Sequence, residues 1–137
     1  MHINKVAVLI KKASLIFEKK SNPIFSKYNL TGAQYKILKY IYSQDTRTAR
    51  IVDLEEEFSM THPTVIELIE QLQKKGFVKR IVNINDKRGK LIALTKKADS
   101  MQKELEAIGD EIETSLTKNI SQKERKELIK LLNKLIG

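Results

Sequence analysis

The side chains best suited to holding an anion stand in a short charged stretch, residues 83–90, which apolar runs flank on both sides. The stretch is therefore expected to be the tip of a β-hairpin. It would carry Asp86, Lys87 and Arg88 into solvent, with Lys90 at its end. A solvated turn explains this polarity without any ligand. Lysine and arginine on a projecting tip could also bind phosphate groups.

A second group of hydrogen-bonding side chains stands where a helix is expected to begin: Thr61, His62, Pro63 and Thr64, with Glu67 one turn later. Threonine and proline are favoured at helix starts in every kind of protein, so capping alone can explain them. In the first turn of an exposed helix, the same side chains could read base edges in a major groove. Glu67 could accept from a cytosine amino group or could simply be solvated.

Charge is distributed unevenly along the chain. Residues 74–97 hold nine basic side chains against one acid, a balance of +8 where the whole chain carries +9. Residues 53–70 hold six acids and neither lysine nor arginine. Lys74 and Lys75, which close the expected helix, could bind phosphate or could complement the helix dipole. A concentrated basic segment favours nucleic acid as a partner.

Several function classes find no support in the composition. The chain has no cysteine and only two histidines, His2 and His62, and neither has metal-ligand spacing. No glycine-rich phosphate loop is present, and the acids in residues 53–58 are best explained as a solvated helix face. We therefore expect neither an enzyme nor a cofactor. Without a long apolar run or a secretory signal, a cytoplasmic protein with no membrane partner is expected.

Hydrophobic periodicity and capping residues predict four helices, a β-hairpin and two further helices. An apolar stripe at residues 3–17 marks the first helix, which residues 21–23 should break or kink. Thr31 and Gln34 form a capping box that begins the second helix. Residues 43–48 read as a turn-like connection.

The remaining elements follow the same signals. A short helix is expected at about 50–58, and the next helix should end near Gly76. Two strands then flank the charged tip. Thr95 can cap a long helix, and Ser121 with Glu124 forms a second capping box before the last helix.

The expected fold is mostly α with a small β-hairpin wing, a winged helix-turn-helix with N- and C-terminal dimerisation helices. Residues 31–95 would form the winged helix-turn-helix DNA-binding part, and residues 1–20 and 96–137 the dimerisation helices, all within one structural unit. The terminal helices carry strong apolar stripes that a lone chain would leave in water. A homodimer is the simplest way to cover them.

Three stretches, "LTGAQYKILKYI", "VDLEEEFSMTHPTVIELIEQLQKKGFVKR" and "NDKRGKLIALT", resemble successive signatures of the MarR-type winged-helix transcriptional regulators. The resemblance covers essentially the whole chain. It implies a homodimer on double-stranded DNA, with groove-reading positions at His62, Pro63, Thr64 and Glu67. It also implies that Arg88 enters the minor groove and that Asp86 orients it. Many relatives are released from operators by a small-molecule effector, anionic or phenolic, so such an effector is a further expected partner.

The chain departs from this family at three points. Ala98 stands where the family often has glycine, and Glu67 stands where some relatives carry a basic or neutral base-contacting residue. Because cysteine is absent, regulation by thiol oxidation cannot operate here. Two other functions stay open: a winged-helix protein-interaction module without operator binding, and a small-molecule carrier that has lost DNA binding. The basic segment at residues 74–97 argues against the interaction module.

Overall fold

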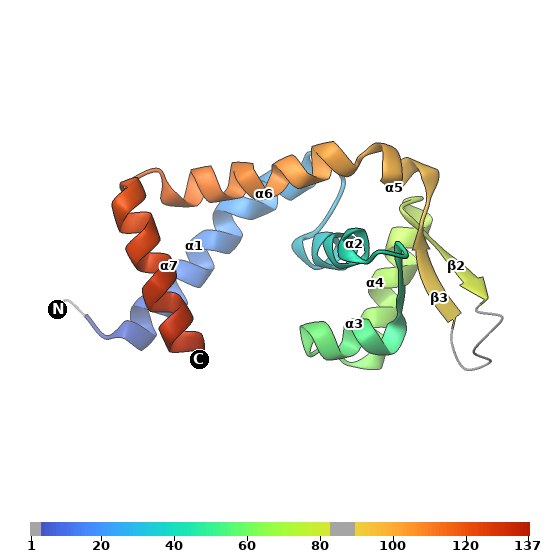
Figure 1. Ribbon diagram of the computed structural model, residues 1–137, viewed down its shortest axis with the longest axis horizontal. Helices are drawn as coiled ribbons and strands as arrows, with labels where there is room; N and C mark the ends of the chain where they lie inside the picture. Colours follow the sequence, from blue (N-terminus) through green and yellow to red (C-terminus); the bar gives the residue numbers. More distant parts are fainter. Residues whose placement is uncertain (1–3, 83–89) are drawn as a thin grey trace.

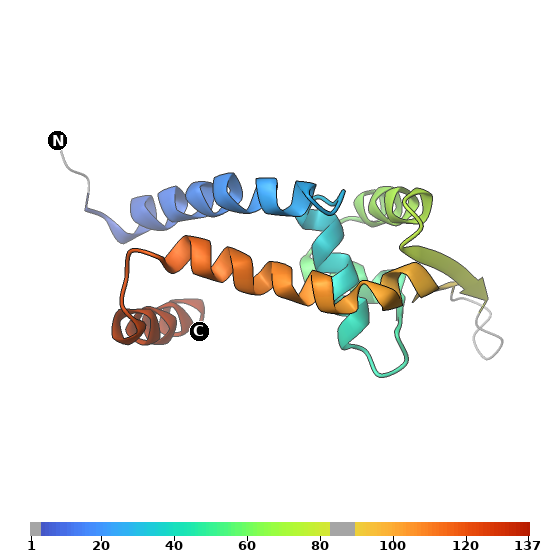
Figure 2. The ribbon, with the colours of Figure 1, turned by 90° about the horizontal axis from the view of Figure 1, so that it is seen from above.

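The computed structural model of this chain describes residues 4–82 and 90–137. Its elements are α1 (Val6–Ser26), α2 (Gly32–Ser43), β1 (Thr48–Arg50), α3 (Ile51–Phe58), α4 (His62–Lys74), β2 (Val78–Val82), β3 (Lys90–Leu94), α5 (Lys96–Ser100), α6 (Gln102–Thr117) and α7 (Gln122–Ile136). This confirms a mostly helical fold with a small β wing. The molecule is elongated, with both termini at one end and β2 and β3 at the other (Figure 1). Figure 2 shows α1 and α6 side by side along the long axis.

Helices α2, α3 and α4 and a three-stranded sheet form the end of the molecule that carries the wing. The sheet has the order β1-β3-β2, and both pairings are antiparallel. Strands β2 and β3 confirm the two predicted strands. β1 is a third strand, which the sequence does not predict, because three residues are too few to display an alternating pattern. Its pairing with β3 defines it.

One apolar core joins this end of the molecule to the terminal helices. Its largest fully buried side chains are Ile37, Leu38, Ile41, Leu54, Val65, Ile69, Leu72, Phe77, Val78, Ile92, Leu105 and Ile108. Burying one such side chain contributes about 1.5–3 kcal/mol. Because α4 contributes Val65, Ile69 and Leu72, its buried face is fixed and its opposite face is presented to solvent.

Both predicted capping boxes are present. Thr31 and Gln34 exchange side-chain and backbone hydrogen bonds at the start of α2, and Ser121 and Glu124 do the same at the start of α7. The predicted cap at Thr95 is also confirmed, since its hydroxyl accepts from the amide of Ala98 at 3.3 Å. Each cap contributes about 1 kcal/mol and fixes where its helix begins.

Of the break or kink predicted at residues 21–23, the break is wrong, because α1 continues through Pro23. Proline removes one backbone donor but keeps a φ angle that a helix accepts. Ile24 and Phe25, which follow it, are buried at 7% and 5% exposure, and the ring of Phe25 lies 5.0 Å from that of Tyr35. This burial offsets the lost hydrogen bond and keeps the helix continuous to Ser26.

The single long helix predicted after Thr95 is also wrong. It is divided into α5 and α6 at Met101, whose φ of −95° and ψ of 3° lie outside the helical range. The hydroxyl of Tyr42 donates to the carbonyl of Ala98, the acceptor that a continuous helix would use one turn later. One apolar stripe nevertheless continues across the interruption, with Ala98, Leu105, Ile108 and Ile112 all buried.

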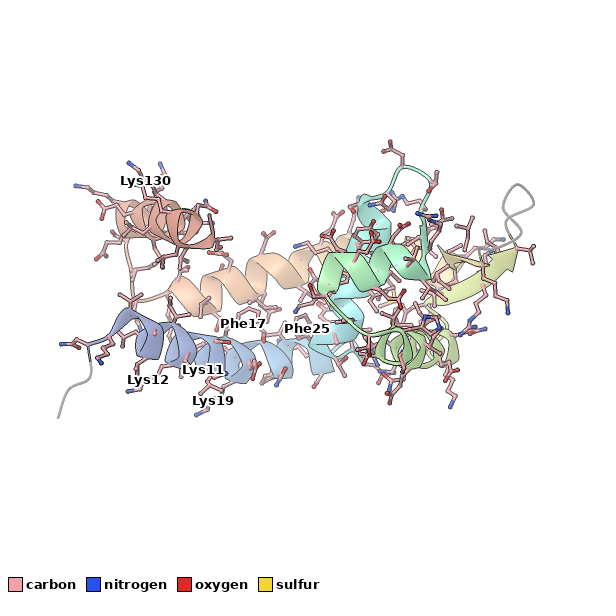
Figure 3. All side chains as sticks on the ribbon, turned by 90° about the horizontal axis from the view of Figure 1, so that it is seen from below. Lys11, Lys12, Phe17, Lys19, Phe25 and Lys130 are labelled. Carbon is pink, nitrogen blue, oxygen red and sulfur yellow. The ribbon has the colours of Figure 1, made fainter. Side chains whose placement is uncertain are left out.

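Helices α1 and α7 expose large apolar side chains. The exposed set is Val6, Leu9, Ile10, Leu15, Ile16 and Phe17 in α1, and Leu128, Ile129, Leu131, Leu132, Leu135 and Ile136 in α7. In Figure 3, Phe17 points toward the side of α6, whereas Lys12 and Lys19 point away from it. No residue of α7 is buried. Exposed apolar side chains in such number on two helices are typical of an interaction site. Among the described residues, every helix is too short or too polar to span a bilayer.

Candidate nucleic-acid interface

The turn between α3 and α4 gives the second helix its direction. Ser59 adopts a left-handed conformation, with φ of 50° and ψ of 43°, and the amide of Met60 donates to the carbonyl of Glu55 at 3.0 Å. This closes α3 and reverses the chain within a few residues. Leu54 in α3 and Val65 in α4 are both fully buried, so the two helices are locked together through the core.

The first turn of α4 presents its polar side chains to solvent. Thr61, His62, Pro63 and Thr64 are all exposed, while the next residue, Val65, is fully buried. Of the two cap candidates in the sequence, Thr61 and His62, Thr61 is the N-cap: its hydroxyl accepts from the amide of Thr64 at 3.4 Å and lies 2.9 Å from the hydroxyl of Thr64. Pro63 lies in the first turn, where its missing amide needs no partner. Thus the four residues serve as a helix start and also form an exposed polar surface.

His62 has a partner that sequence alone does not identify. Its Nδ1 lies 3.1 Å from Oε1 of Glu55, a carboxylate whose side chain is 23% exposed. The side chain of His62 itself is 64% exposed. The ring is therefore held on one side by α3 and open to solvent on the other.

Glu67, one turn along α4, is exposed and belongs to a chain of side-chain hydrogen bonds. Gln71 donates to Glu67 at 3.5 Å, and Gln34 donates to Gln71 at 2.8 Å. Gln34 is only 2% exposed, and its carbonyl oxygen also accepts from Lys75 at 2.8 Å. The sequence marks Gln34 only as half of a capping box. Its second role, joining α2 to α4, depends on how the two helices cross.

Lys74 and Lys75 differ in their surroundings. Lys74 is exposed in the last turn of α4. Lys75 is half-buried, and its ammonium group also donates to the carbonyl of Asn29 at 2.7 Å. The ammonium of Lys97 donates to the carbonyl of Lys75 at 2.7 Å and so closes the carboxyl end of α4. The fold itself therefore uses the charge of Lys75, and a phosphate contact by this residue stays a prediction.

Strands β2 and β3 bring exposed lysines to the wing end of the molecule. Lys90 is exposed at the start of β3 and pairs with Val82 at the end of β2. Lys79, on β2, is also exposed. Asp86, Lys87 and Arg88, the other predicted site residues, lie outside the described residues. Within the described part of the chain, the candidate site is therefore the first turn of α4, Glu67, Lys74 and Lys90.

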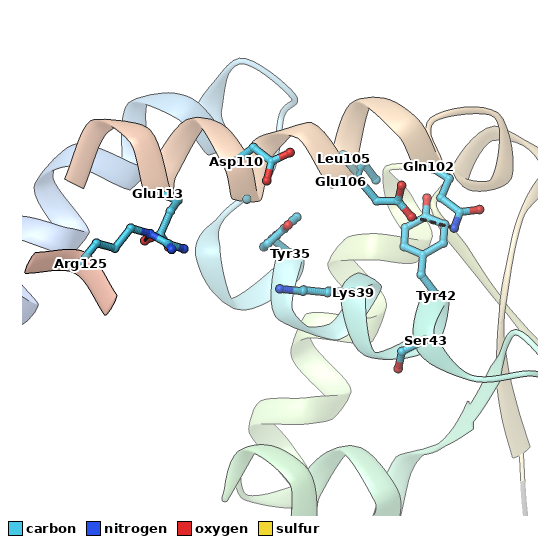
Figure 4. Close-up of a pocket in the computed structure, with 11 residues that line it drawn as sticks. Tyr35, Lys39, Tyr42, Ser43, Gln102, Leu105, Glu106, Asp110, Glu113 and Arg125 are labelled. Atoms are coloured by element: carbon cyan, nitrogen blue, oxygen red, sulfur yellow. Dashed lines mark hydrogen bonds and ion pairs between the residues drawn. The ribbon is translucent and has the colours of Figure 1, made fainter. Parts of the chain in front are cut away.

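A pocket of about 480 Å³ lies between α2 and α6 and reaches the first turns of α7 (Figure 4). It is lined by Tyr35, Lys39, Tyr42, Ser43, Gln102, Leu105, Glu106, Gly109, Asp110, Glu113 and Arg125. Gln102 donates to Glu106 at 3.0 Å, and Arg125 pairs with Glu113 at 3.1 Å. The lining thus combines two phenol rings with more acids than bases. Among the described residues, no group of three or more His, Cys, Asp or Glu side chains is arranged to hold a metal ion.

Tyr42, which lines this pocket, carries a phenol that loses its proton at alkaline pH. Burial, and then the charge of Asp99, raise the pKa of Tyr42 to about 12. Because the folded pKa exceeds the unfolded one, the neutral phenol stabilises the fold fully below pH 10, and this stability is lost as the pH rises toward 12. Stability should therefore decline over this range, and less steeply in Tyr42→Phe. Urea titrations of both proteins at several pH values would test this, and the comparison is needed because the pKa values of Tyr35 and Tyr40 are also raised.

Comparison with known proteins identifies proteins that are similar to this chain in sequence and in fold. A model of the MarR family matches residues 30–90. The HTH-type transcriptional regulator MgrA of Staphylococcus aureus is 31% identical over 116 residues, which cover 85% of this chain and 76% of MgrA. A mutant of MarR from E. coli complexed with operator DNA superposes with a TM-score of 0.84 and 28% identity, covering 96% of this chain and 94% of that one. The S. aureus MepR–DNA complex gives a TM-score of 0.84 and 25% identity, covering 98% of each chain.

Proposed function

Because this chain belongs to the MarR family of winged helix-turn-helix transcriptional regulators, we propose that it binds operator DNA as a homodimer and acts as a repressor. The observation that carries the proposal is the exposed polar first turn of α4, mounted on a helix whose other face is fixed in the core. A helix of this kind enters the major groove with its first residues near base edges. MarR and MepR have both been described in complex with DNA.

The proposed contacts divide into base readers and phosphate binders. His62 and Thr64 read bases from the exposed first turn of α4 and Glu67 reads from the next turn, with Thr61 and Pro63 setting the helix start. Lys74 and Lys90, both exposed, contact phosphates on either side. Lys87 and Arg88 extend this contact at the wing, with Arg88 in the minor groove and Asp86 orienting it. Phosphate contacts release counterions, so binding should weaken steeply as salt rises.

Dimerisation follows from the exposed apolar faces of α1 and α7. Two copies that cover these faces would present two α4 helices to successive major grooves, roughly 10 base pairs apart. The operator is then an imperfect palindrome. Selecting bound fragments from a random DNA pool, with the mass of the protein measured alongside, tests both points. If the protein is a monomer and binds no double-stranded DNA even at low ionic strength, the protein-interaction module is favoured instead.

Arg88→Ala should weaken operator binding about tenfold and relax the preference for A·T flanks, because arginine favours the narrow minor groove of A·T-rich sequence. The slope of affinity against salt should also fall by about one ion. Fluorescence anisotropy with operators that differ only in their flanks measures these effects. Lys118→Ala, which removes an equal charge at an exposed site beyond α6, is the matched control. Equal losses for both variants would contradict a role for Arg88 in the wing.

The pocket between α2 and α6 is the proposed effector site. The pocket lies against α2, and Gln34 of α2 is hydrogen-bonded to Gln71 of α4. A ligand that shifts α2 should therefore also shift α4, the helix proposed to read the bases. Acids outnumber bases in its lining by Glu106, Asp110 and Glu113 to Lys39 and Arg125. This balance favours an aromatic ligand that carries a cationic group over the anionic members of the anionic or phenolic ligands expected from the family.

Benzylammonium and benzoate, matched in size and opposite in charge, test the effector proposal. Benzylammonium should bind more tightly, should release DNA, and should lose affinity in Asp110→Asn. Glu104→Gln removes the same charge from α6 outside the lining and should change little. Equal binding of the two probes, measured by NMR shifts of the lining residues, would count against a cationic effector.

A further inference from the structure

We propose that Glu55 determines the base preference of this regulator by fixing which nitrogen of His62 carries the proton. Glu55 lies in α3 rather than in the reading helix, and none of the sequence patterns marks it as a contact to DNA. The inference rests on the proposed function, because it takes His62 as a reader of base edges. It adds a positioning residue that acts through His62.

The geometry leaves one arrangement of protons for the neutral ring. Nδ1 of His62 lies 3.1 Å from Oε1 of Glu55, within hydrogen-bond range. An ionised carboxylate can only accept a hydrogen bond, so Nδ1 must donate it. A neutral imidazole carries a single N–H, and Nε2 is therefore left with its lone pair.

The surroundings hold this arrangement in place. The side chain of Glu55 is 23% exposed and sits on α3, whose last turn is closed by the bond from Met60 to the carbonyl of Glu55. The side chain of His62 is 64% exposed and its Nδ1 is bonded to Glu55, so Nε2 is the ring nitrogen left to meet a ligand. The carboxylate thus orients the ring as well as its proton, as partners of functional histidines commonly do.

A lone pair at Nε2 selects among the four bases. In the major groove, adenine and cytosine present amino donors, whereas guanine presents only acceptors and thymine an acceptor and a methyl group. When its ring is neutral, His62 should therefore favour adenine or cytosine at the base it meets. Without Glu55 the proton can occupy Nε2 instead, and the ring can then donate to guanine as well.

Two measurements on the intact protein test the proposal. The first needs no DNA: nitrogen NMR at alkaline pH, where imidazoles are neutral, reports the tautomer of each histidine. His62 should carry its proton on Nδ1 in the wild type and should shift toward the Nε2-protonated form in Glu55→Ala. His2, the other histidine, serves as an internal reference. An unchanged tautomer in the variant overturns the proposal.

The second measurement is selection from a random DNA pool. Glu55→Ala should raise the share of guanine at one position of each half-site about fivefold, the value of one hydrogen bond. Glu56→Ala and Glu57→Ala remove the same charge from exposed sites on α3 and should strengthen binding without changing the preferred base. In a His62→Ala background, Glu55→Ala should have no further effect on preference.

The outcomes separate the inference from the proposed function. If the wild type selects a palindrome and Glu55→Ala selects the same sequence, regulation by operator binding stands and the role of Glu55 fails. If the wild-type protein selects no sequence, both the proposed operator binding and the role of Glu55 fail. An effect of Glu55→Ala that persists without His62 would show that the carboxylate acts through another group, which also overturns the proposal.

Discussion

Replacing Leu132 with lysine should convert the protein to monomers and lower its affinity for a palindromic operator by at least about a hundredfold. Leu132 lies in the apolar stripe of α7, a helix in which no residue is buried within the single chain. In a symmetric dimer the substitution enters the interface twice, and each ammonium group would lose its hydration there. A monomer also loses the gain of binding two half-sites at once, which is worth about 10²–10⁴ in affinity.

Asn133→Lys is the control for this prediction. It adds the same charge to the same helix, but Asn133 lies on the lysine-bearing side, close to Lys130 in helical position. It should leave both the mass and the affinity nearly unchanged. Light scattering and anisotropy on the same samples measure the two quantities. A Leu132→Lys protein that stays dimeric would place the interface elsewhere.

Phe77→Ala should reduce the free energy of unfolding by about 3–5 kcal/mol, the usual range for deleting a buried phenylalanine. Phe77 is 1% exposed at the junction of α4 and β2, and the ammonium of Lys97 lies 4.7 Å from the centre of its ring. Its backbone also joins α4 to the residue that follows β3, because its amide donates to the carbonyl of Leu72 and its carbonyl accepts from the amide of Thr95. Removing the ring should therefore loosen the packing that holds both α4 and the wing strands β2 and β3.

Urea unfolding at one fixed protein concentration measures this loss, since the proposed dimer would make stability depend on protein concentration. Val82→Ala is a matched control on β2, because Val82 is 79% exposed. It should change stability by no more than about 0.5 kcal/mol. A loss below about 1 kcal/mol for Phe77→Ala would mean that the ring is not central to the core.

The fold was predictable where short-range signals agree with packing. The capping boxes at Thr31 and Ser121 act between residues three apart, so the sequence alone identifies them. The break at Pro23 and the continuous helix through Met101 were predicted wrongly because distant partners decide them. Burial of Phe25 against Tyr35 keeps α1 intact, and the hydroxyl of Tyr42 interrupts the later helix.

The candidate site also contains residues that local sequence signals identify and residues that only the folded structure brings together. The exposed start of α4 was predictable because Thr61 and Pro63 mark a helix start directly. The Glu55–His62 contact was not, because it joins two helices across a turn whose geometry depends on a left-handed Ser59. Gln34 and the residues lining the pocket likewise come together only when α2 crosses α4 and α6.

Because α1 is one continuous helix, a change in the angle of its amino end also moves its carboxyl end. Its 21 residues span about 30 Å, with the amino end among the exposed apolar residues and the carboxyl end anchored in the core by Ile24 and Phe25. A tilt of about 10° between two copies would displace the anchored end by about 5 Å, more than the rise of about 3.4 Å per base pair. The angle at which two copies cross should thus set the length of operator that fits.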